Sequence, residues 1–260
     1  MLFRAKTFLK SNLPRPVYEG LRLAKNPQDI KSALRFATSS ELELPVGTRL
    51  GVLRRMFLAT FSIECPHTQD EVLRFMEAIL MLPDSIPGCV IEAGCYKGGS
   101  TAKFSLATKL AGRKLKVFDS FEGIPEHEED HGKNIFGDEA AFPPGSYKGA
   151  LEEVQSNVER FGDPSVCTYV KGWFDDTLPG FDEPVAAAYL DVDLASSTKT
   201  CLKYLYPLLS PGGVLFSQDG HLPLVLDVFR DRSFWEDELG CSPPRLEGLG
   251  QSKLIRLSKA

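Results

Sequence analysis

The sequence has no excess of positive charge and no long apolar segment. It carries 30 Lys and Arg against 35 Asp and Glu, which gives a net charge of −5. Binding to nucleic acid without sequence preference needs a basic surface that neutralises phosphates, so this balance argues against nucleic acid and favours a small-molecule partner. No segment approaches the roughly 18 apolar residues of a membrane-spanning helix, and no integral membrane association is expected.

The sequence also lacks paired cysteines. Its six cysteines include no Cys-x-x-Cys pair and show no regular spacing, and several stand inside apolar runs. A thiol in such a run behaves as a small hydrophobe. This pattern indicates a reducing compartment without disulfides or zinc, and therefore a cytoplasmic location. The cysteines are Cys65, Cys89, Cys95, Cys167, Cys201 and Cys241.

The first 16 residues alternate apolar side chains with Arg4, Lys6, Lys10 and Arg15. They lack the uninterrupted apolar stretch of a secretion signal. A basic amphipathic segment can lie on an anionic membrane, but we favour a helix that packs on the body of the protein or on a second copy.

At 260 residues and 43% hydrophobic content, the chain can build one sizeable core. We expect an N-terminal helical extension over residues 1–67 and one catalytic domain over residues 68–260, with Thr68 capping its first helix after His67. Near-continuous apolar strands alternate with amphipathic helices, which is typical of a parallel sheet covered on both faces. The expected strands are residues 89–93, 115–120, 166–172, 185–193, 212–219 and, at the sheet edge, 252–259. The expected helices are residues 68–82, from 99 or 100 onwards, 149–161, 197–209 and 222–239.

Residues 125–147 interrupt this alternation with a polar, acidic segment rich in glycine and proline. A loop this long in a compact α/β domain is usually a lid, a binding loop or disordered. It follows the second strand, at the carboxyl edge where open α/β sheets bind ligands, so we expect a lid over the active site. Its sequence HEEDH, residues 127–131, could suggest a metal site, but a solvated acidic loop is the favoured interpretation.

A glycine-rich turn follows the first strand, in the sequence VIEAGCYKGGSTAKF of residues 90–104. So many glycines predict that the backbone comes very close to something. The turn is neither a phosphate-binding P-loop nor a clean Gly-x-Gly-x-x-Gly fingerprint. Asp119 ends the next strand, where an acid can accept hydrogen bonds from both hydroxyls of a ribose. Turn and acid together indicate a nucleoside-containing cofactor.

Four motifs occur in order at successive strand ends: GCYKGGST, DSFEGIP, GWFDDTLP and LDVDLASST, the last followed by YLYPLLSPGGVLFSQDG. This series resembles the macrocin O-methyltransferase (TylF/MycF/NovP-like) family of class I S-adenosylmethionine-dependent enzymes, which methylate sugar hydroxyls of natural products. The resemblance covers roughly residues 68–230. It implies a Rossmann-like α/β fold, a mostly parallel seven-stranded sheet with helices on both faces, and a homodimer or larger homo-oligomer.

The resemblance also implies a site for S-adenosylmethionine. Glu92 and Gly94 would lie against its methionine part, and Asp119 would take the ribose. The other residues implied are Ala93, Tyr96, Gly98, Gly99 and Ser100 around the methionine part, Ser120 and Phe121 beside the ribose, and Gly172, Trp173 and Phe174 at the adenine. A cationic sulfonium suits an acidic, partly apolar cleft. For Trp173 the alternative is an ordinary core aromatic.

Aspartates at two further strand ends predict a metal-assisted reaction. Asp191 and Asp193 end the fourth strand and Asp219 ends the fifth, so all three can project from one edge of the sheet. Oxygen ligands without a His/Cys cluster favour Mg²⁺ over Zn²⁺, and a bound cation lowers the pKa of a coordinated oxygen acid. We predict Asp191 as metal ligand and general base, with Gln218 and Asp219 as further ligands and Asp193 as an alternative.

The chain departs from the family at Gln218, where the family usually has a second aspartate. A glutamine carbonyl carries no formal charge, so we expect weaker metal binding or none. His221 then becomes a candidate catalytic base or ligand, with a structural or surface role as the alternative.

The leading hypothesis is an S-adenosylmethionine-dependent O-methyltransferase that acts on a hydroxyl of a sugar or glycosylated small molecule. The alternatives are a non-catalytic relative that binds the cofactor and a nucleotide-cofactor oxidoreductase. The missing dinucleotide fingerprint and the aspartates after the fourth strand count against the oxidoreductase.

Overall fold

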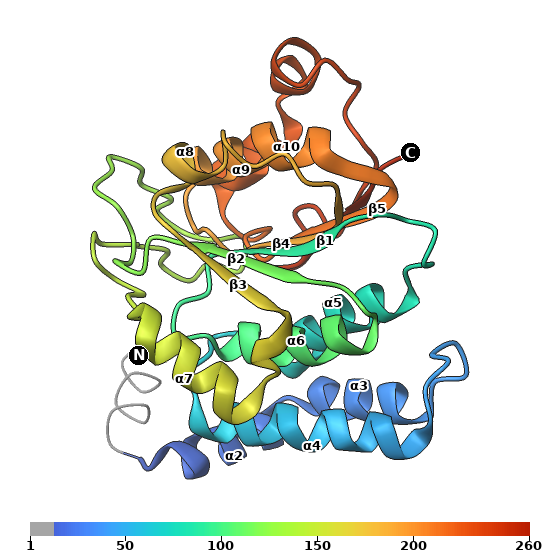
Figure 1. The fold of residues 1–260 in the computed structure, drawn as a ribbon. Helices are drawn as coiled ribbons and strands as arrows, with labels where there is room; N and C mark the ends of the chain where they lie inside the picture. The colour runs from blue at the N-terminus through green and yellow to red at the C-terminus, as the bar shows by residue number, and fades with distance from the viewer. Residues whose placement is uncertain (1–12) are drawn as a thin grey trace.

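The computed structural model describes residues 13–260 in four stacked layers (Figure 1). Most of the basic N-terminal segment lies outside the described residues. One layer is a seven-stranded sheet in the order β3-β2-β1-β4-β5-β7-β6, in which β7 runs antiparallel to both neighbours. The strands are β1 (Cys89–Ala93), β2 (Leu115–Asp119), β3 (Cys167–Lys171), β4 (Val185–Leu190), β5 (Leu209–Ser217), β6 (Leu246–Glu247) and β7 (Ile255–Ser258). The predicted mostly parallel seven-stranded sheet is therefore confirmed.

The strands β1 and β4 form the centre of the sheet, and every residue in them is buried. Their sequences CVIEA and VAAAYL are short apolar runs, as expected where helices cover both faces of a parallel sheet. One detail of the predicted sheet is wrong. The strand at residues 255–258 does not form the edge, because the two-residue strand β6 pairs along its outer side.

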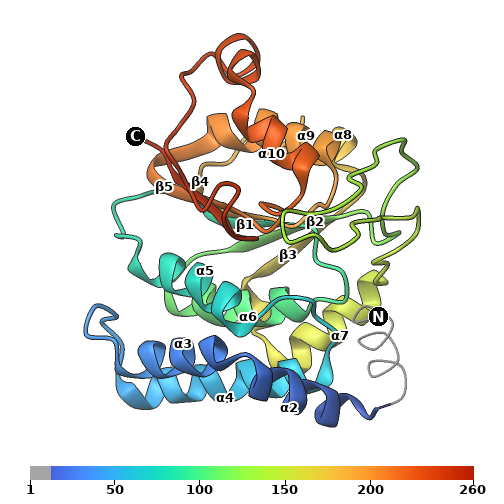
Figure 2. The same ribbon diagram turned by 180° about the vertical axis from the view of Figure 1, so that it is seen from behind.

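Helices cover both faces of the sheet, as Figures 1 and 2 show from opposite sides. One face carries α5 (Gln69–Met81), α6 (Gly99–Leu110) and α7 (Leu151–Phe161); the other carries α8 (Phe174–Thr177), α9 (Ala195–Leu208) and α10 (Pro223–Arg230). A short 3-10 helix (Pro164–Val166) precedes β3.

Thr68 caps α5 as predicted, because its side chain accepts the Glu71 N–H while the Glu71 carboxylate accepts the Thr68 N–H. The single helix predicted for residues 222–239 is wrong. It stops at Arg230, since the Asp231 carboxylate accepts the N–H groups of Ser233 and Phe234 and starts a separate π-helical turn (Phe234–Glu238).

The N-terminal helices α2 (Arg15–Lys25), α3 (Pro27–Thr38) and α4 (Val46–Ser62) form the outermost layer, on the far side of α5–α7 from the sheet (Figure 2). Their apolar residues Phe36, Val52 and Met56 belong to the same buried cluster as Phe75 of α5 and Tyr189 of β4. This layer and the sheet therefore share one core. Among the helices of residues 13–260, none has the length and apolar character needed to cross a membrane.

The long loop of residues 125–147 has no helix or strand, apart from one isolated bridge between Lys133 and Glu139. It is tied to the body of the protein at two places. The Glu129 carboxylate accepts the N–H groups of Ala195 and Ser196 at 2.7 and 2.9 Å, at the start of α9. The Ile135 N–H donates to the His221 carbonyl at 3.0 Å. The loop is thus held at the carboxyl ends of β4 and β5.

Candidate active site

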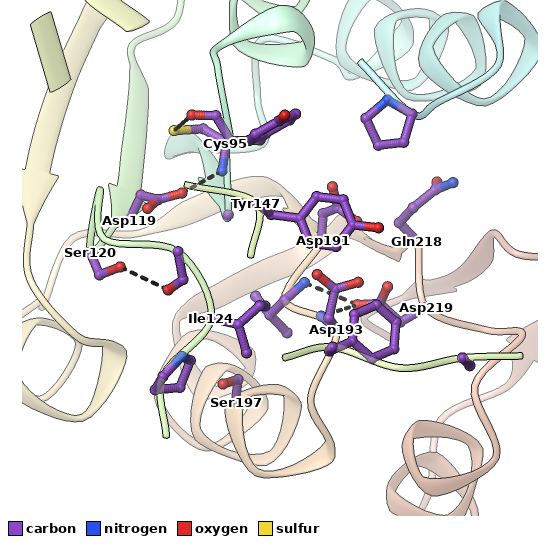
Figure 3. Close-up of a pocket in the computed structure, with 18 of the residues that line it drawn as sticks. Cys95, Asp119, Ser120, Ile124, Tyr147, Asp191, Asp193, Ser197, Gln218 and Asp219 are labelled. Atoms are coloured by element: carbon purple, nitrogen blue, oxygen red, sulfur yellow. Dashed lines mark hydrogen bonds between the residues drawn. The ribbon is translucent and has the colours of Figure 1, made fainter. Parts of the chain in front are cut away.

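A cavity of about 490 Å³ opens at the carboxyl ends of the central strands. Its wall takes one residue from the end of each of five strands: Gly94, Asp119, Gly172, Asp191 and Gln218. The long loop closes the cavity with Pro125, Asn134, Glu139, Ala140, Ala141, Phe142 and Tyr147. This is the position expected of a lid, and Figure 3 shows part of this lining.

The predicted cofactor residues separate into two groups. One group lines the cavity: Gly94, Tyr96, Asp119, Ser120, Gly172, Trp173 and Phe174. The other group is buried and does not line it: Glu92, Ala93, Gly98, Gly99, Ser100 and Phe121. The first group can touch a ligand directly, whereas the second can only shape the wall from behind.

The glycine-rich turn approaches other parts of the protein very closely. A Cβ atom on Gly94 would lie 2.0 Å from the backbone oxygen of Asp191, and one on Gly99 would lie 2.8 Å from the Cβ of Cys65. Gly98 has a φ of 75° and packs against Val154 of α7. The close approach predicted from these glycines is therefore an approach to other segments of the same chain, and of the three only Gly94 also lines the cavity.

Glu92 lies behind the glycine-rich turn and is fully buried. Burial raises the pKa of its carboxyl group to about 8, although the nearby hydroxyls of Ser100 and Thr101 lower it. Neither oxygen has a hydrogen-bond partner within the described chain. At neutral pH the side chain is therefore mostly protonated and adds little negative charge behind the cavity.

Asp119 is oriented by two backbone groups of neighbouring turns. Its Oδ2 accepts the Cys95 N–H and its Oδ1 accepts the Phe121 N–H, each at 2.7 Å. Each carboxylate oxygen can accept a further hydrogen bond, and the side chain lines the cavity. The geometry suits recognition of two adjacent hydroxyls. Trp173 is 36% exposed on the cavity wall, so its alternative role as a core aromatic is wrong.

Three carboxylates meet at the other end of the cavity (Figure 3). Asp191, Asp193 and Asp219 each offer an oxygen, and these oxygens lie within 4.8 Å of one another. The Asp219 Oδ2 accepts the N–H groups of Val192 and Asp193 at 3.0 and 3.1 Å, which holds the two loops together. Asp193 has a left-handed backbone with a φ of 59°. This turn lets it join Asp191 on the cavity side, although alternate strand residues face opposite ways.

The carboxylate cluster is electrostatically strained without a cation. Burial raises the pKa of Asp219 to about 7, and repulsion from Asp191 adds to the effect. Burial and repulsion from Asp219 and Asp191 likewise hold the pKa of Asp193 well above its usual range. A divalent cation would relieve this repulsion, and the all-oxygen donor set suits Mg²⁺. The residues therefore fit the predicted metal.

Gln218 lines the cavity beside this cluster, but its carbonyl oxygen already has a partner. Oε1 accepts the Tyr189 hydroxyl at 2.6 Å, and both side chains are buried. A carbonyl oxygen has two lone pairs, so one remains for a cation or a substrate.

His221 lines the cavity on the lid side. Its ring stacks on Phe136 of the lid, with the centroids 6.3 Å apart. Burial, together with the nearby positive charge of Lys253, lowers the pKa of His221 to about 4. The imidazole is therefore neutral at pH 7. A neutral ring can accept a proton, but so low a pKa makes it a weak base.

The sequence analysis missed His67 as a part of the site. Its Nε2 lies 2.8 Å from the Asp191 Oδ2, and its side chain is only 3% exposed. Burial alone would lower the pKa of His67, but the negative charges of the Asp191 carboxylate and the Cys65 thiolate raise it well above its usual value. No local pattern could have shown this contact, because 124 positions separate the two residues.

The sequence and the fold are similar to those of known methyltransferases. A family model described as macrocin O-methyltransferase (TylF) matches residues 69–232. The chain belongs to this family. The predicted family and enzyme class are therefore confirmed, and the alternative of a nucleotide-cofactor oxidoreductase is set aside.

Two characterised relatives illustrate the match. The 8-demethyl-8-(2,3-dimethoxy-alpha-L-rhamnosyl)-tetracenomycin-C 4'-O-methyltransferase of Streptomyces olivaceus is 34% identical over 183 residues, 65% of this chain and 67% of that protein. The mycinamicin III 3''-O-methyltransferase of Micromonospora griseorubida is 35% identical over 173 residues, 61% of this chain and 66% of that protein. The match thus spans about two thirds of the length of each relative.

Solved structures confirm the fold. The O-methyltransferase NovP superposes with a TM-score of 0.67 at 20% identity, over 82% of this chain and 99% of that one. The calicheamicin methyltransferase CalS11 superposes with a TM-score of 0.56 at 19% identity, over 90% and 92% of the two chains. At this identity the likeness establishes the class I methyltransferase fold alone.

Proposed function

We propose that this protein is an S-adenosylmethionine-dependent O-methyltransferase that methylates a hydroxyl of a sugar or glycosylated small molecule with the help of Mg²⁺. One observation carries the proposal. A single cavity has the carboxylate of Asp119 at one end and a cluster of three carboxylates at the other. The first suits a nucleoside cofactor, and the second suits a cation that activates a hydroxyl.

The residues on the cavity wall support a position for each part of the cofactor. Asp119 would accept the ribose hydroxyls, Gly94 and Tyr96 would border the methionine part, and Trp173 and Phe174 would border the adenine. Aromatic rings also favour a nearby sulfonium, because their faces carry partial negative charge. The buried Glu92 would not contact the cofactor. It would support the shape of the glycine-rich turn and, because it is mostly protonated, add little charge there.

Asp191, Asp193 and Asp219 would hold the cation, with Gln218 as a neutral fourth ligand. When bound, S-adenosylmethionine supplies a methyl group activated by its sulfonium, and Mg²⁺ lowers the pKa of a hydroxyl in contact with it. During methyl transfer from that cofactor the acceptor hydroxyl would give up its proton, and Asp191 would accept it. His221 stays a second candidate for that proton, since it is neutral and faces the same cavity.

The acceptor would occupy the lid side of the cavity. There Asn134, Glu139, His221 and Lys253 offer polar groups, while Phe142 and Tyr147 offer aromatic faces. This mixture suits a sugar, whose ring has both hydroxyl groups and an apolar C–H face. Both relatives named above are O-methyltransferases, and the name of the Streptomyces olivaceus enzyme specifies a rhamnosyl group on its substrate, which supports the same substrate class.

A second candidate function is cofactor binding without turnover. It is favoured by Gln218, whose carbonyl is neutral and is already bonded to Tyr189. If the cation does not bind, the acceptor hydroxyl is not activated. This candidate predicts binding of S-adenosylhomocysteine with no added heat from Mg²⁺.

Calorimetric titration with S-adenosylhomocysteine, repeated with Mg²⁺ and with EDTA, tests the proposal without knowledge of the acceptor. We expect micromolar binding in both conditions and a further heat with Mg²⁺. Binding without any effect of Mg²⁺ would favour the non-catalytic candidate. No binding in either condition would refute both.

We also infer a cytoplasmic homo-oligomer. Its six cysteines are all free, as suits a reducing compartment.

Large apolar side chains stand exposed on the N-terminal layer, as suits a surface covered by a second copy. They are Val17, Leu21, Ile30, Leu34, Val46, Leu50 and Leu58. Light scattering during size-exclusion chromatography would give the mass directly; a monomer across the micromolar range would refute the oligomer.

A further inference from the structure

His67 stands where the connection between α4 and α5 passes the cavity. Both Pro66 and His67 line the cavity from this connection. The imidazole packs edge-on against Tyr189, with ring centroids 5.8 Å apart, and its Nε2 lies 2.8 Å from the Asp191 Oδ2. The ring therefore connects the N-terminal half of the chain to the residue that we propose as metal ligand and base.

Both nitrogens of this ring have partners. An ionised Asp191 carboxylate can only accept, so Nε2 must carry the proton that joins them. The other nitrogen, Nδ1, faces the Cys65 sulfur at 3.7 Å. A ring bonded on both sides cannot rotate without losing both contacts. The orientation of the N–H toward Asp191 is thus fixed by the fold.

The backbone of this connection is anchored from α2. Arg22 donates from Nη1 to the Cys65 carbonyl at 3.0 Å and from Nη2 to the carbonyls of Pro66, at 3.2 Å, and His67. Arg22 is itself paired with Glu19, which is buried and also pairs with Arg15 at 3.1 Å. At the other end, the capping box of Thr68 starts α5 directly after His67. The imidazole is therefore held by elements on both sides of it.

We propose that His67 is a positioning residue: its Nε2–H holds one oxygen of Asp191 and leaves the other for the cation, and Arg22 of α2 holds His67 in place. This inference rests on the proposed function of the carboxylate cluster. A hydrogen bond from a neighbouring side chain restricts the rotation of a ligand carboxylate and so lowers the cost of ordering it when the cation binds.

The test compares His67→Phe with His67→Gln. Phenylalanine keeps a ring against Tyr189 but removes both nitrogens, whereas the glutamine amide nitrogen can replace the Nε2 donor. The probes are Mn²⁺, followed by electron paramagnetic resonance in the presence of S-adenosylhomocysteine, and S-adenosylhomocysteine itself, followed by calorimetry. We expect His67→Phe to weaken Mn²⁺ binding about tenfold or more and to change S-adenosylhomocysteine affinity less than about twofold. His67→Gln should recover most of the Mn²⁺ affinity.

A second pair of variants tests the anchor. Arg22→Met combined with Glu19→Gln removes the guanidinium together with the buried carboxylate that pairs with it. Arg15, the other partner of Glu19, keeps its bonds to the carbonyls of Thr60 and Ile63. Arg54→Met, at an exposed arginine on α4, is the matched control. The double variant should weaken Mn²⁺ binding, but should have almost no further effect in the His67→Phe background, since both changes act through the same imidazole. The control should bind Mn²⁺ like the wild type.

Three outcomes would overturn the inference. His67→Phe with wild-type Mn²⁺ affinity would show that the imidazole does not position Asp191. An equal loss of Mn²⁺ and S-adenosylhomocysteine affinity would show a general structural role. Wild-type protein that binds S-adenosylhomocysteine but no Mn²⁺ would remove the cation on which the inference rests. Wild-type protein that does not bind S-adenosylhomocysteine would instead refute the proposed function itself, so the two failures are distinguishable.

Discussion

Replacement of Asp119 by alanine tests the cofactor site most directly. The carboxylate is already held by the N–H groups of Cys95 and Phe121 at 2.7 Å, so it faces the cavity in one orientation. The variant loses the acceptor for the ribose hydroxyls. A hydrogen bond to a charged group contributes about 1.5–3 kcal/mol, and about 1.4 kcal/mol corresponds to a tenfold change in affinity. One lost bond therefore weakens binding at least about tenfold, and two weaken it at least about a hundredfold.

The assay is calorimetric titration of Asp119→Ala with S-adenosylhomocysteine. Asp182→Ala, which removes an exposed aspartate before β4, is the control and should bind like the wild type. Thermal unfolding of both variants separates a loss of fold from a loss of contact, because Asp119→Ala also leaves the N–H groups of Cys95 and Phe121 without this acceptor. A folded Asp119→Ala protein with wild-type affinity would remove Asp119 from the site and refute the cofactor assignment.

Three further predictions concern the rest of the site. Asp191→Asn should keep S-adenosylhomocysteine binding and abolish turnover; a near-native rate would end its assignment as metal ligand and base. Gln218→Asp should strengthen Mn²⁺ binding in calorimetry by adding a formal charge to the cluster, and weaker binding would show that the bond to Tyr189 matters more. Burial raises the pKa of Glu92 to about 8 in the folded protein, above the value of a free glutamate. The stability that the protonated Glu92 side chain provides should therefore be complete below about pH 4 and should be lost as the pH rises through 8. Urea unfolding of wild type and Glu92→Gln between pH 5 and 8 should show a smaller decline in the variant, and parallel curves would contradict the raised pKa.

The sheet was predictable because its central strands are buried on both faces. CVIEA and VAAAYL stand out as short, mostly apolar runs, and the structure places β1 and β4 on those residues. The strand β6 was not predictable, since two residues give no periodic signal and its pairing depends on the return of β7. The break after Arg230 follows from the capping of the next turn by Asp231, a local contact that the apolar pattern of residues 222–239 does not show.

The site was predictable where a residue ends a strand. Asp119, Asp191, Gln218 and Asp219 reach the same cavity because parallel strands end at one edge of the sheet. Gly98 and Gly99 were misleading, because glycine reports a close approach but not the identity of the neighbour. That neighbour is Val154 for Gly98 and Cys65 for Gly99.

The contact between His67 and Asp191 crosses the domain boundary that was predicted from the sequence. The predicted boundary between the N-terminal extension and the catalytic domain, at residues 67 and 68, stays a prediction. It falls directly after His67, whose imidazole contacts Asp191. The sequence motifs all lie after this boundary, because they stand at the ends of strands. The predicted site therefore contained no residue before it. The contacts of Arg22 with the carbonyls of residues 65–67, and the core shared by Phe36 and Tyr189, join the N-terminal layer to the rest of the protein. Proteins that share the residues at the strand ends can therefore still differ in what orients the side chain of Asp191.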